Sequence, residues 1–143
     1  MSDRKLVILL AEDDPGDRIP VAAYLRSKGH KVVEAVNPAQ TIRCLEAASD
    51  RIDAIVLDLI MPEDDPKGGE KVLEYMNHND IMVPVILATA WGYNGPAEEA
   101  RQIHPKAVKK VMTKTFLPAE LHDEVVNAVK GTGNGSKSKA AAK

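Results

Sequence analysis

Short apolar runs alternate five times with longer amphipathic stretches along this chain, and this alternation constrains the fold more than any other feature. Each apolar run is long enough for a buried strand, and most of the stretches between the runs carry apolar residues at helical spacing. Strands that alternate with helices form right-handed crossover units, with helices on both faces of one parallel sheet. The sequence therefore predicts an α/β fold with a doubly wound, five-stranded parallel sheet. The predicted strands are residues 6–11, 32–36, 54–59, 83–88 and 108–112.

The charges within these runs predict the order of the strands. The first, third and fourth runs are almost wholly apolar, which is typical of strands that are buried on both faces. The second run contains Glu34, and the fifth contains Lys109 and Lys110, so we expect both at the edges of the sheet. The flavodoxin-like order 2-1-3-4-5 satisfies these constraints.

The length of 143 residues suits one domain, which we place at residues 1–130. Residues 131–143 are rich in Gly, Ser and Lys and contain no large apolar side chain, so they are expected to form a flexible tail.

Composition excludes several classes of protein. The net charge of −2 gives no sign of a nucleic-acid-binding surface, and no apolar run approaches the length of a membrane span. Cys44 is the single cysteine, which excludes an internal disulfide and fits a reducing compartment. The N-terminal segment lacks the features of a secretory signal. We therefore expect a cytoplasmic protein with no nucleic-acid partner and no membrane insertion.

Charged and polar side chains follow four of the predicted strands, at the edge where such a sheet binds ligands. In the order 2-1-3-4-5 the ligand site lies beyond the carboxyl ends of the strands, between the first and the third. Glu12 and Asp13 follow the first run, and Asp58 lies near the end of the third. Thr89 stands at the end of the fourth run, directly after residue 88, and Lys114 follows the fifth. These residues are therefore expected to converge on one edge.

Crowded carboxylates need a compensating cation. Two carboxylates about 5 Å apart repel each other by about 3 kcal/mol at an effective dielectric constant near 20. Such a group takes up a proton or binds a hard divalent ion, and Mg²⁺ suits a site shared with phosphate. A carboxylate can itself accept a phosphoryl group, while the Lys114 ammonium and the Thr89 hydroxyl can bind its oxygens. The cluster therefore predicts Mg²⁺-dependent phosphoryl transfer to Asp58.

Four segments together resemble the receiver domain of bacterial two-component response regulators. They read ILLAEDDP at residues 8–15, DAIVLDLIMP at 53–62, PVILATA at 84–90 and MTKTF at 112–116. Each motif alone is weak, but all four occur in order, and the resemblance covers about residues 5–130.

The resemblance implies a role for each residue of the cluster. Asp58 corresponds to the phosphoacceptor, Thr89 to the switch hydroxyl, and Lys114 to the lysine that binds the phosphoryl group. Mg²⁺ would be held by Glu12, Asp13, Asp58 and the backbone carbonyl of Ile60.

The resemblance also implies a stand-alone, CheY-like signalling module rather than an enzyme. A sensor histidine kinase or phosphotransfer protein would donate the phosphoryl group. The surface of the fourth helix, fifth strand and fifth helix would bind a downstream protein. The only chemistry of the module would be its own phosphorylation and dephosphorylation.

Two positions depart from the family pattern. The family usually has proline directly after the lysine, and Thr115 stands there in this chain. It often has an aromatic residue three positions before the lysine, and Val111 stands there. Both departures favour an alternative, a phosphorylation-independent pseudo-receiver scaffold.

A flavodoxin-type cofactor binder would share the winding. It is disfavoured because carboxylates, which repel phosphate, follow the first strand where such proteins place a hydroxyl- and Gly-rich loop.

Trp91 stands two residues after Thr89. We hypothesise that Trp91 and Ile60 shield the phosphoryl group on Asp58 from water and slow its hydrolysis.

Overall fold

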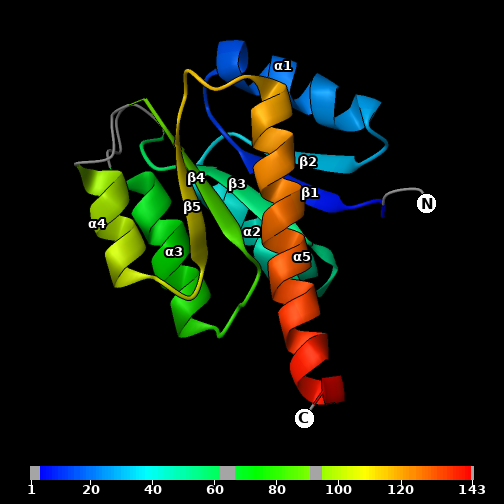
Figure 1. Ribbon diagram of the computed structural model, residues 1–143. Coiled ribbons are helices and arrows are strands. Elements are labelled where there is room, and N and C mark those ends of the chain that lie inside the picture. The colour runs from blue at the N-terminus through cyan, green and yellow to red at the C-terminus, as the bar shows by residue number, and fades with distance from the viewer. Residues whose placement is uncertain (1–3, 62–66, 91–94, 143) are drawn as a thin grey trace.

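A computed structural model describes residues 4–61, 67–90 and 95–142, with side chains as far as residue 131. Within these ranges the chain forms one parallel sheet with the order β2-β1-β3-β4-β5, which confirms the predicted winding (Figure 1). The strands are β1 (Val7–Ala11), β2 (Lys31–Ala35), β3 (Ala54–Asp58), β4 (Val85–Thr89) and β5 (Val108–Thr113). The helices are α1 (Pro15–Ser27), α2 (Pro38–Ala48), α3 (Gly68–His78), α4 (Pro96–Ile103) and α5 (Pro118–Ala142), with a 3-10 turn at Ser49–Arg51.

The helices cover both faces of the sheet. Successive strand residues point to opposite sides, so a strand that is apolar throughout presents apolar side chains to both faces. Leu9 and Ile55 belong to the core under α2, α3 and α4. Ile8 and Val56 belong to the core under α1 and α5. Every residue of β3 and β4 is buried, as expected for central strands. This double burial explains why the polar residues of β3 and β4, Asp58 and Thr89, stand at the ends of these strands.

The outer strands carry the charges that predicted their positions. Glu34 on β2 and both Lys109 and Lys110 on β5 are exposed. Glu34 accepts ion pairs from Arg18 and Arg26 of α1 at 2.9 Å each. The edge of the sheet at β2 is thereby tied to the helix that follows β1.

The last helix continues past residue 130, where composition predicts the end of the domain. Gly131, Gly133 and Gly135 are poor helix formers in this stretch. The division of the chain into a domain and a flexible tail stays a prediction. Among the described residues, no helix combines the length and the apolar character that a membrane crossing requires.

A histidine pair joins α5 to the start of the sheet, although the sequence assigns no role to either residue. The backbone N–H of Leu6 donates to His30 Nδ1 at 3.1 Å. A neutral His30 that accepts at Nδ1 carries its proton on Nε2, so it donates to His122 Nε2, 2.9 Å away. The pair fixes α5 against the face of the sheet that it shares with α1.

Candidate functional site

Three strand ends place charged side chains at the carboxyl edge of the sheet. Asp58 is the last residue of β3, Glu12 directly follows β1, and Lys114 directly follows β5. Ala11 of β1 lies opposite Leu57 of β3. The next residue of each segment, Glu12 after β1 and Asp58 in β3, therefore lies at the same level of the sheet. Both carboxylates are buried, with 4% of Glu12 and 5% of Asp58 exposed. The structure therefore brings these three predicted residues together.

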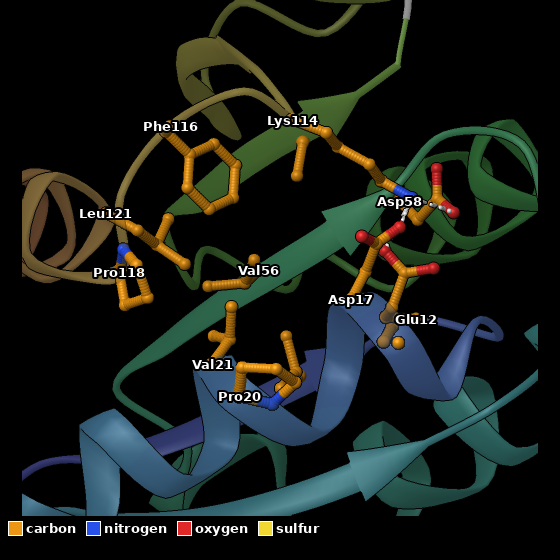
Figure 2. A pocket seen from close by; sticks show the side chains of 14 residues that line it. Glu12, Asp17, Pro20, Val21, Val56, Asp58, Lys114, Phe116, Pro118 and Leu121 are labelled. Atoms are coloured by element: carbon orange, nitrogen blue, oxygen red, sulfur yellow. Dashed lines mark hydrogen bonds and ion pairs between the residues drawn. The ribbon is translucent and has the colours of Figure 1, made fainter.

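The ammonium group of Lys114 lies among three carboxylates (Figure 2). Its Nζ atom is 2.6 Å from Glu12 Oε1, 3.0 Å from Asp58 Oδ2 and 3.3 Å from Asp17 Oδ2. Only 16% of the Lys114 side chain is exposed, so solvent screens the pairs with the two buried carboxylates weakly.

Asp17 is the member of this group that the sequence analysis does not single out. It lies in the first turn of α1, which begins at the same edge of the sheet. An acidic residue soon after the pair Glu12 and Asp13 is a weak signal that could have indicated it. The partner Lys114 is 97 residues away, so the spacing along the chain does not show the contact.

Asp13 completes a set of oxygen donors. Carboxylate oxygens of Glu12, Asp13 and Asp58 all lie within 4.8 Å of one another. Mg²⁺ prefers such hard oxygen ligands and usually keeps part of its water shell, so three nearby carboxylates fit this ion. The backbone N–H of Ile60 donates to Asp58 Oδ1 at 3.2 Å and so helps to orient the carboxylate. The role of the Ile60 carbonyl as a metal ligand stays a prediction.

Thr89 lies at the same edge, as the last residue of β4. It is buried, with 3% of its surface exposed, and it pairs with Thr113 in the register of β4 and β5. Its carbonyl accepts a hydrogen bond from the backbone N–H of Lys114 at 2.7 Å. This bond fixes the point at which Lys114 leaves the sheet. Trp91, for which we predict a shielding role, lies outside the described residues.

Arg18 of α1 supports the backbone of the acidic pair, a role that sequence reasoning missed. Its Nη1 donates to the carbonyl of Glu12 at 3.1 Å and to that of Asp13 at 3.4 Å. Its Nε donates to Glu34 Oε1 at 2.9 Å. The guanidinium therefore links the loop after β1 to β2.

Burial is the largest influence on the pKa values of the two buried carboxyl groups, Glu12 and Asp58. It raises the pKa of Glu12 to about 8, and the hydrogen bond from Lys114 opposes this rise. Burial also raises the pKa of Asp58 against the attraction of Lys114. Burial favours the neutral amine of Lys114, but Glu12 and Asp58 outweigh burial and raise the pKa of Lys114 above its usual value. The ionised forms of Glu12 and Asp58 are thus unfavourable even beside Lys114, and a divalent cation is suited to stabilise them in place of a proton.

A cavity of about 160 Å³ adjoins the cluster on the side of α1 and the start of α5 (Figure 2). Glu12, Asp17, Asp58 and Lys114 line its polar end, while Val56, Val21, Phe116 and Leu121 are among the apolar residues that line the rest. These apolar side chains lower the local dielectric constant beside the carboxylates, which strengthens their interactions with any cation.

Comparison with known families shows the family to which this chain belongs. The family described as the response regulator receiver domain matches residues 8–126, which includes every residue of the cluster. The chain belongs to the receiver-domain family. The resemblance found in the sequence is therefore confirmed, and the family is a signalling module of two-component systems.

Relatives of this receiver domain occur in larger proteins. The transcriptional regulatory protein GlrR of Escherichia coli is 30% identical over 129 residues, covering 90% of this chain but 27% of that protein. The sensor kinase CckA of Brucella abortus is 28% identical over 123 residues, covering 81% of this chain and 13% of that protein. The chain thus spans 27% or less of the length of these two relatives.

Solved structures of receiver domains share this fold over nearly the whole chain. The receiver domain of a LuxO repressor protein from Vibrio parahaemolyticus superposes with a TM-score of 0.76 and 25% identity, over 93% of this chain and 96% of that one. The receiver domain of the sensor histidine kinase PA1611 from Pseudomonas aeruginosa has a TM-score of 0.71 and 26% identity, over 88% and 98% respectively. That structure contains a magnesium ion in its active-site cleft.

Proposed function

We propose that this receiver domain is a phosphorylation switch in which Asp58 accepts a phosphoryl group with the help of Mg²⁺. The observation that carries the proposal is the environment of Asp58. Its carboxylate is buried at the end of β3, 3.0 Å from Lys114 Nζ and beside the oxygen donors of Glu12 and Asp13. A buried carboxylate with these neighbours is suited to accept a phosphoryl group and to hold its charge.

The reaction uses few protein groups. A carboxylate oxygen of Asp58 attacks the phosphorus, an O–P bond forms, and the bond from phosphorus to the donor breaks. When the donor is a phosphohistidine, the N–P bond breaks and the imidazole nitrogen keeps the electron pair. Lys114 and the Thr89 hydroxyl bind oxygens of the transferred group. Hydrolysis of the O–P bond later returns the carboxylate and inorganic phosphate.

Mg²⁺, held by Glu12, Asp13, Asp58 and the Ile60 carbonyl, would neutralise the charge that develops on the phosphoryl oxygens. The magnesium in the related PA1611 receiver domain supports this assignment.

The partners follow from the same proposal. A sensor histidine kinase or phosphotransfer protein supplies the phosphoryl group at the carboxyl edge. The face formed by α4, β5 and α5 changes its binding to a downstream protein, because Lys114 contacts the acceptor and its backbone N–H is bonded to Thr89 of β4. We place the module in the cytoplasm and propose that it acts without a nucleic-acid partner.

A specific observation favours the alternative, a pseudo-receiver scaffold. Val111 is buried in the core under α2, α3 and α4, and it lacks the ring that rotates in many receiver domains. Thr115 is exposed in the turn after Lys114 and does not restrain the backbone as proline would. A scaffold of this kind would keep the fold and bind its partners without phosphorylation.

Incubation with acetyl phosphate and Mg²⁺, followed by intact mass measurement, tests the proposal. We expect the protein to gain one phosphoryl group, and we expect Asp58→Asn to gain none. Asp50→Asn, in the 3-10 turn away from the site, is the matched control and should be phosphorylated like the unaltered protein. Absence of the gain from the unaltered protein, together with absence of Mg²⁺ binding, would support the scaffold.

Mg²⁺ should bind more weakly as the pH falls below about 8. Glu12 has its pKa raised to about 8, so below that pH it is mostly protonated and must lose its proton to bind the ion. A single coupled proton weakens binding by up to about tenfold for each pH unit. Calorimetric titrations at about pH 8 and about pH 6 measure this slope.

Glu12→Gln provides the control for this pH dependence. Its Mg²⁺ binding should be weaker at high pH and should depend less on pH, because the proton of Glu12 is no longer involved. Equal affinity of the unaltered protein at both pH values would contradict the assignment of Glu12 as a ligand that titrates near pH 8.

A further inference from the structure

Among the residues that the structure describes, Lys114 has one carboxylate partner that is not among the predicted metal ligands. Its ammonium contacts Glu12 and Asp58, which both belong to the set of oxygen donors for Mg²⁺. The third contact, to Asp17 Oδ2 at 3.3 Å, comes from the first turn of α1 and lies outside that set. An ammonium group has three N–H donors, so it can serve all three carboxylates at once.

The position of Lys114 opposes the binding of the cation. The ammonium group is close to two of the carboxylates that would hold Mg²⁺, so the two positive charges repel each other. Once Glu12 and Asp58 are neutralised by the ion, their attraction for Lys114 weakens. Of the three carboxylates that the structure describes around Lys114, Asp17 then remains to hold the ammonium group. Its side chain is 46% exposed, so it can follow a small shift of Lys114 toward solvent.

We propose that Asp17 is a positioning residue, which holds Lys114 beside the acceptor after the cation has entered and until a phosphoryl oxygen binds the ammonium group. This inference rests on the proposed function and adds a role to a residue outside the predicted site. Asp17 acts through Lys114 and contacts neither the ion nor the phosphorus.

The backbone around Lys114 explains why such a partner matters in this chain. Thr115, which follows Lys114, lacks the fixed φ angle of proline. The backbone N–H of Lys114 is fixed to the carbonyl of Thr89, but the long side chain beyond it has many rotamers. An ion pair with Asp17 reduces this freedom and keeps the ammonium group at the carboxyl edge.

A double-mutant cycle on Mg²⁺ affinity tests the inference. Asp17→Asn should weaken Mg²⁺ binding by up to about fivefold, the size expected for losing one partly exposed ion pair. Without Asp17, Lys114 stays on Glu12 and Asp58 and competes with the ion. In a Lys114→Met background, the same Asp17→Asn change should alter the Mg²⁺ affinity by less than about twofold, because the residue through which Asp17 acts is gone. Asp17→Glu should restore most of the affinity.

The outcomes separate this inference from the proposed function. The inference fails if Asp17→Asn binds Mg²⁺ like the unaltered protein. It also fails if the loss is equally large with Lys114→Met, since Asp17 would then act on the ion directly or through its charge alone. Failure of the unaltered protein to bind Mg²⁺ and to accept a phosphoryl group would instead reject the proposed function. Thermal unfolding of each variant without Mg²⁺ shows whether it is folded before its affinity is interpreted.

Discussion

Lys114→Met should destabilise the metal-free protein by about 3 kcal/mol at pH 8 and above, because removing one partner of a buried ion pair leaves the other charge uncompensated. Here two carboxylates, Glu12 and Asp58, would lose their shared cation at 2.6 and 3.0 Å. Both are almost completely buried, so water would not replace the lost interaction. Urea unfolding without added metal measures the change in the free energy of unfolding.

The size of this loss should grow with pH. The pKa of Glu12 in the folded protein is raised to about 8 from 4.5. A raised carboxyl pKa means that its contribution to stability is complete below the unfolded-state pKa and is lost as the pH rises through the folded-state pKa. Lys114 lowers the pKa of both carboxyl groups, so its removal raises them further and enlarges the loss at high pH.

Mg²⁺ provides a second check on the same variant. Added Mg²⁺ should restore much of the stability of Lys114→Met at pH 8, because the ion binds the folded state and neutralises the same carboxylates. Lys109→Met, on the exposed side of β5, is the matched control and should change stability by no more than about 0.5 kcal/mol. Equal stability of the two variants in metal-free urea unfolding would show that Lys114 does not compensate the buried charges.

The fold could be predicted because its pattern is repeated and its strands differ in charge. Glu34 on the second strand and Lys109 on the fifth placed these strands at the edges, and the structure has them there. The cluster could be predicted because a parallel sheet brings all carboxyl ends to one edge. The convergence of Glu12, Asp58 and Lys114 could be predicted from that rule alone, without any knowledge of side-chain geometry.

Contacts between helices and distant loops could not be predicted in the same way. Asp17 meets Lys114 across 97 positions, and His30 meets His122 across 92. Each contact depends on the rotation of a helix about its axis and on one side-chain rotamer. Neither the rotation nor the rotamer produces a periodic pattern of residues in the sequence. Arg18 was missed for a related reason, since its partners are backbone carbonyls, which every residue carries.

The second large effect concerns the start of α3, where the chain returns against the segment that carries Asp58. Gly69 lies so close to this segment that a Cβ atom on it would be 2.5 Å from the Cα of Leu59 and 2.8 Å from the carbonyl oxygen of Asp58. Its backbone N–H also donates to the carbonyl of Leu59 at 2.7 Å. These neighbours are backbone atoms, which cannot rotate away as a side chain would.

Gly69→Ala should therefore destabilise the protein by about 3 kcal/mol or more, at the upper end of the range for overpacking. The added methyl group must push the turn after β3 away from α3, and the hydrogen bond from Gly69 to Leu59 would lengthen. Gly131→Ala is the matched control, because a Cβ atom there meets nothing within 4 Å. In a helix, this control change should be neutral or slightly stabilising. Thermal unfolding of the two variants compares them directly.

The same variant tests whether the turn after β3 positions the acceptor. Asp58 Oδ1 accepts the backbone N–H of Ile60, so a displaced turn moves the carboxylate relative to Lys114 and the other oxygen donors. At a temperature where Gly69→Ala is still folded, phosphorylation by acetyl phosphate should be slower than in the unaltered protein, while Gly131→Ala should react normally. If Gly69→Ala unfolds at the same temperature as the control and is phosphorylated as fast, the close approach of α3 neither limits the fold nor holds Asp58 in place.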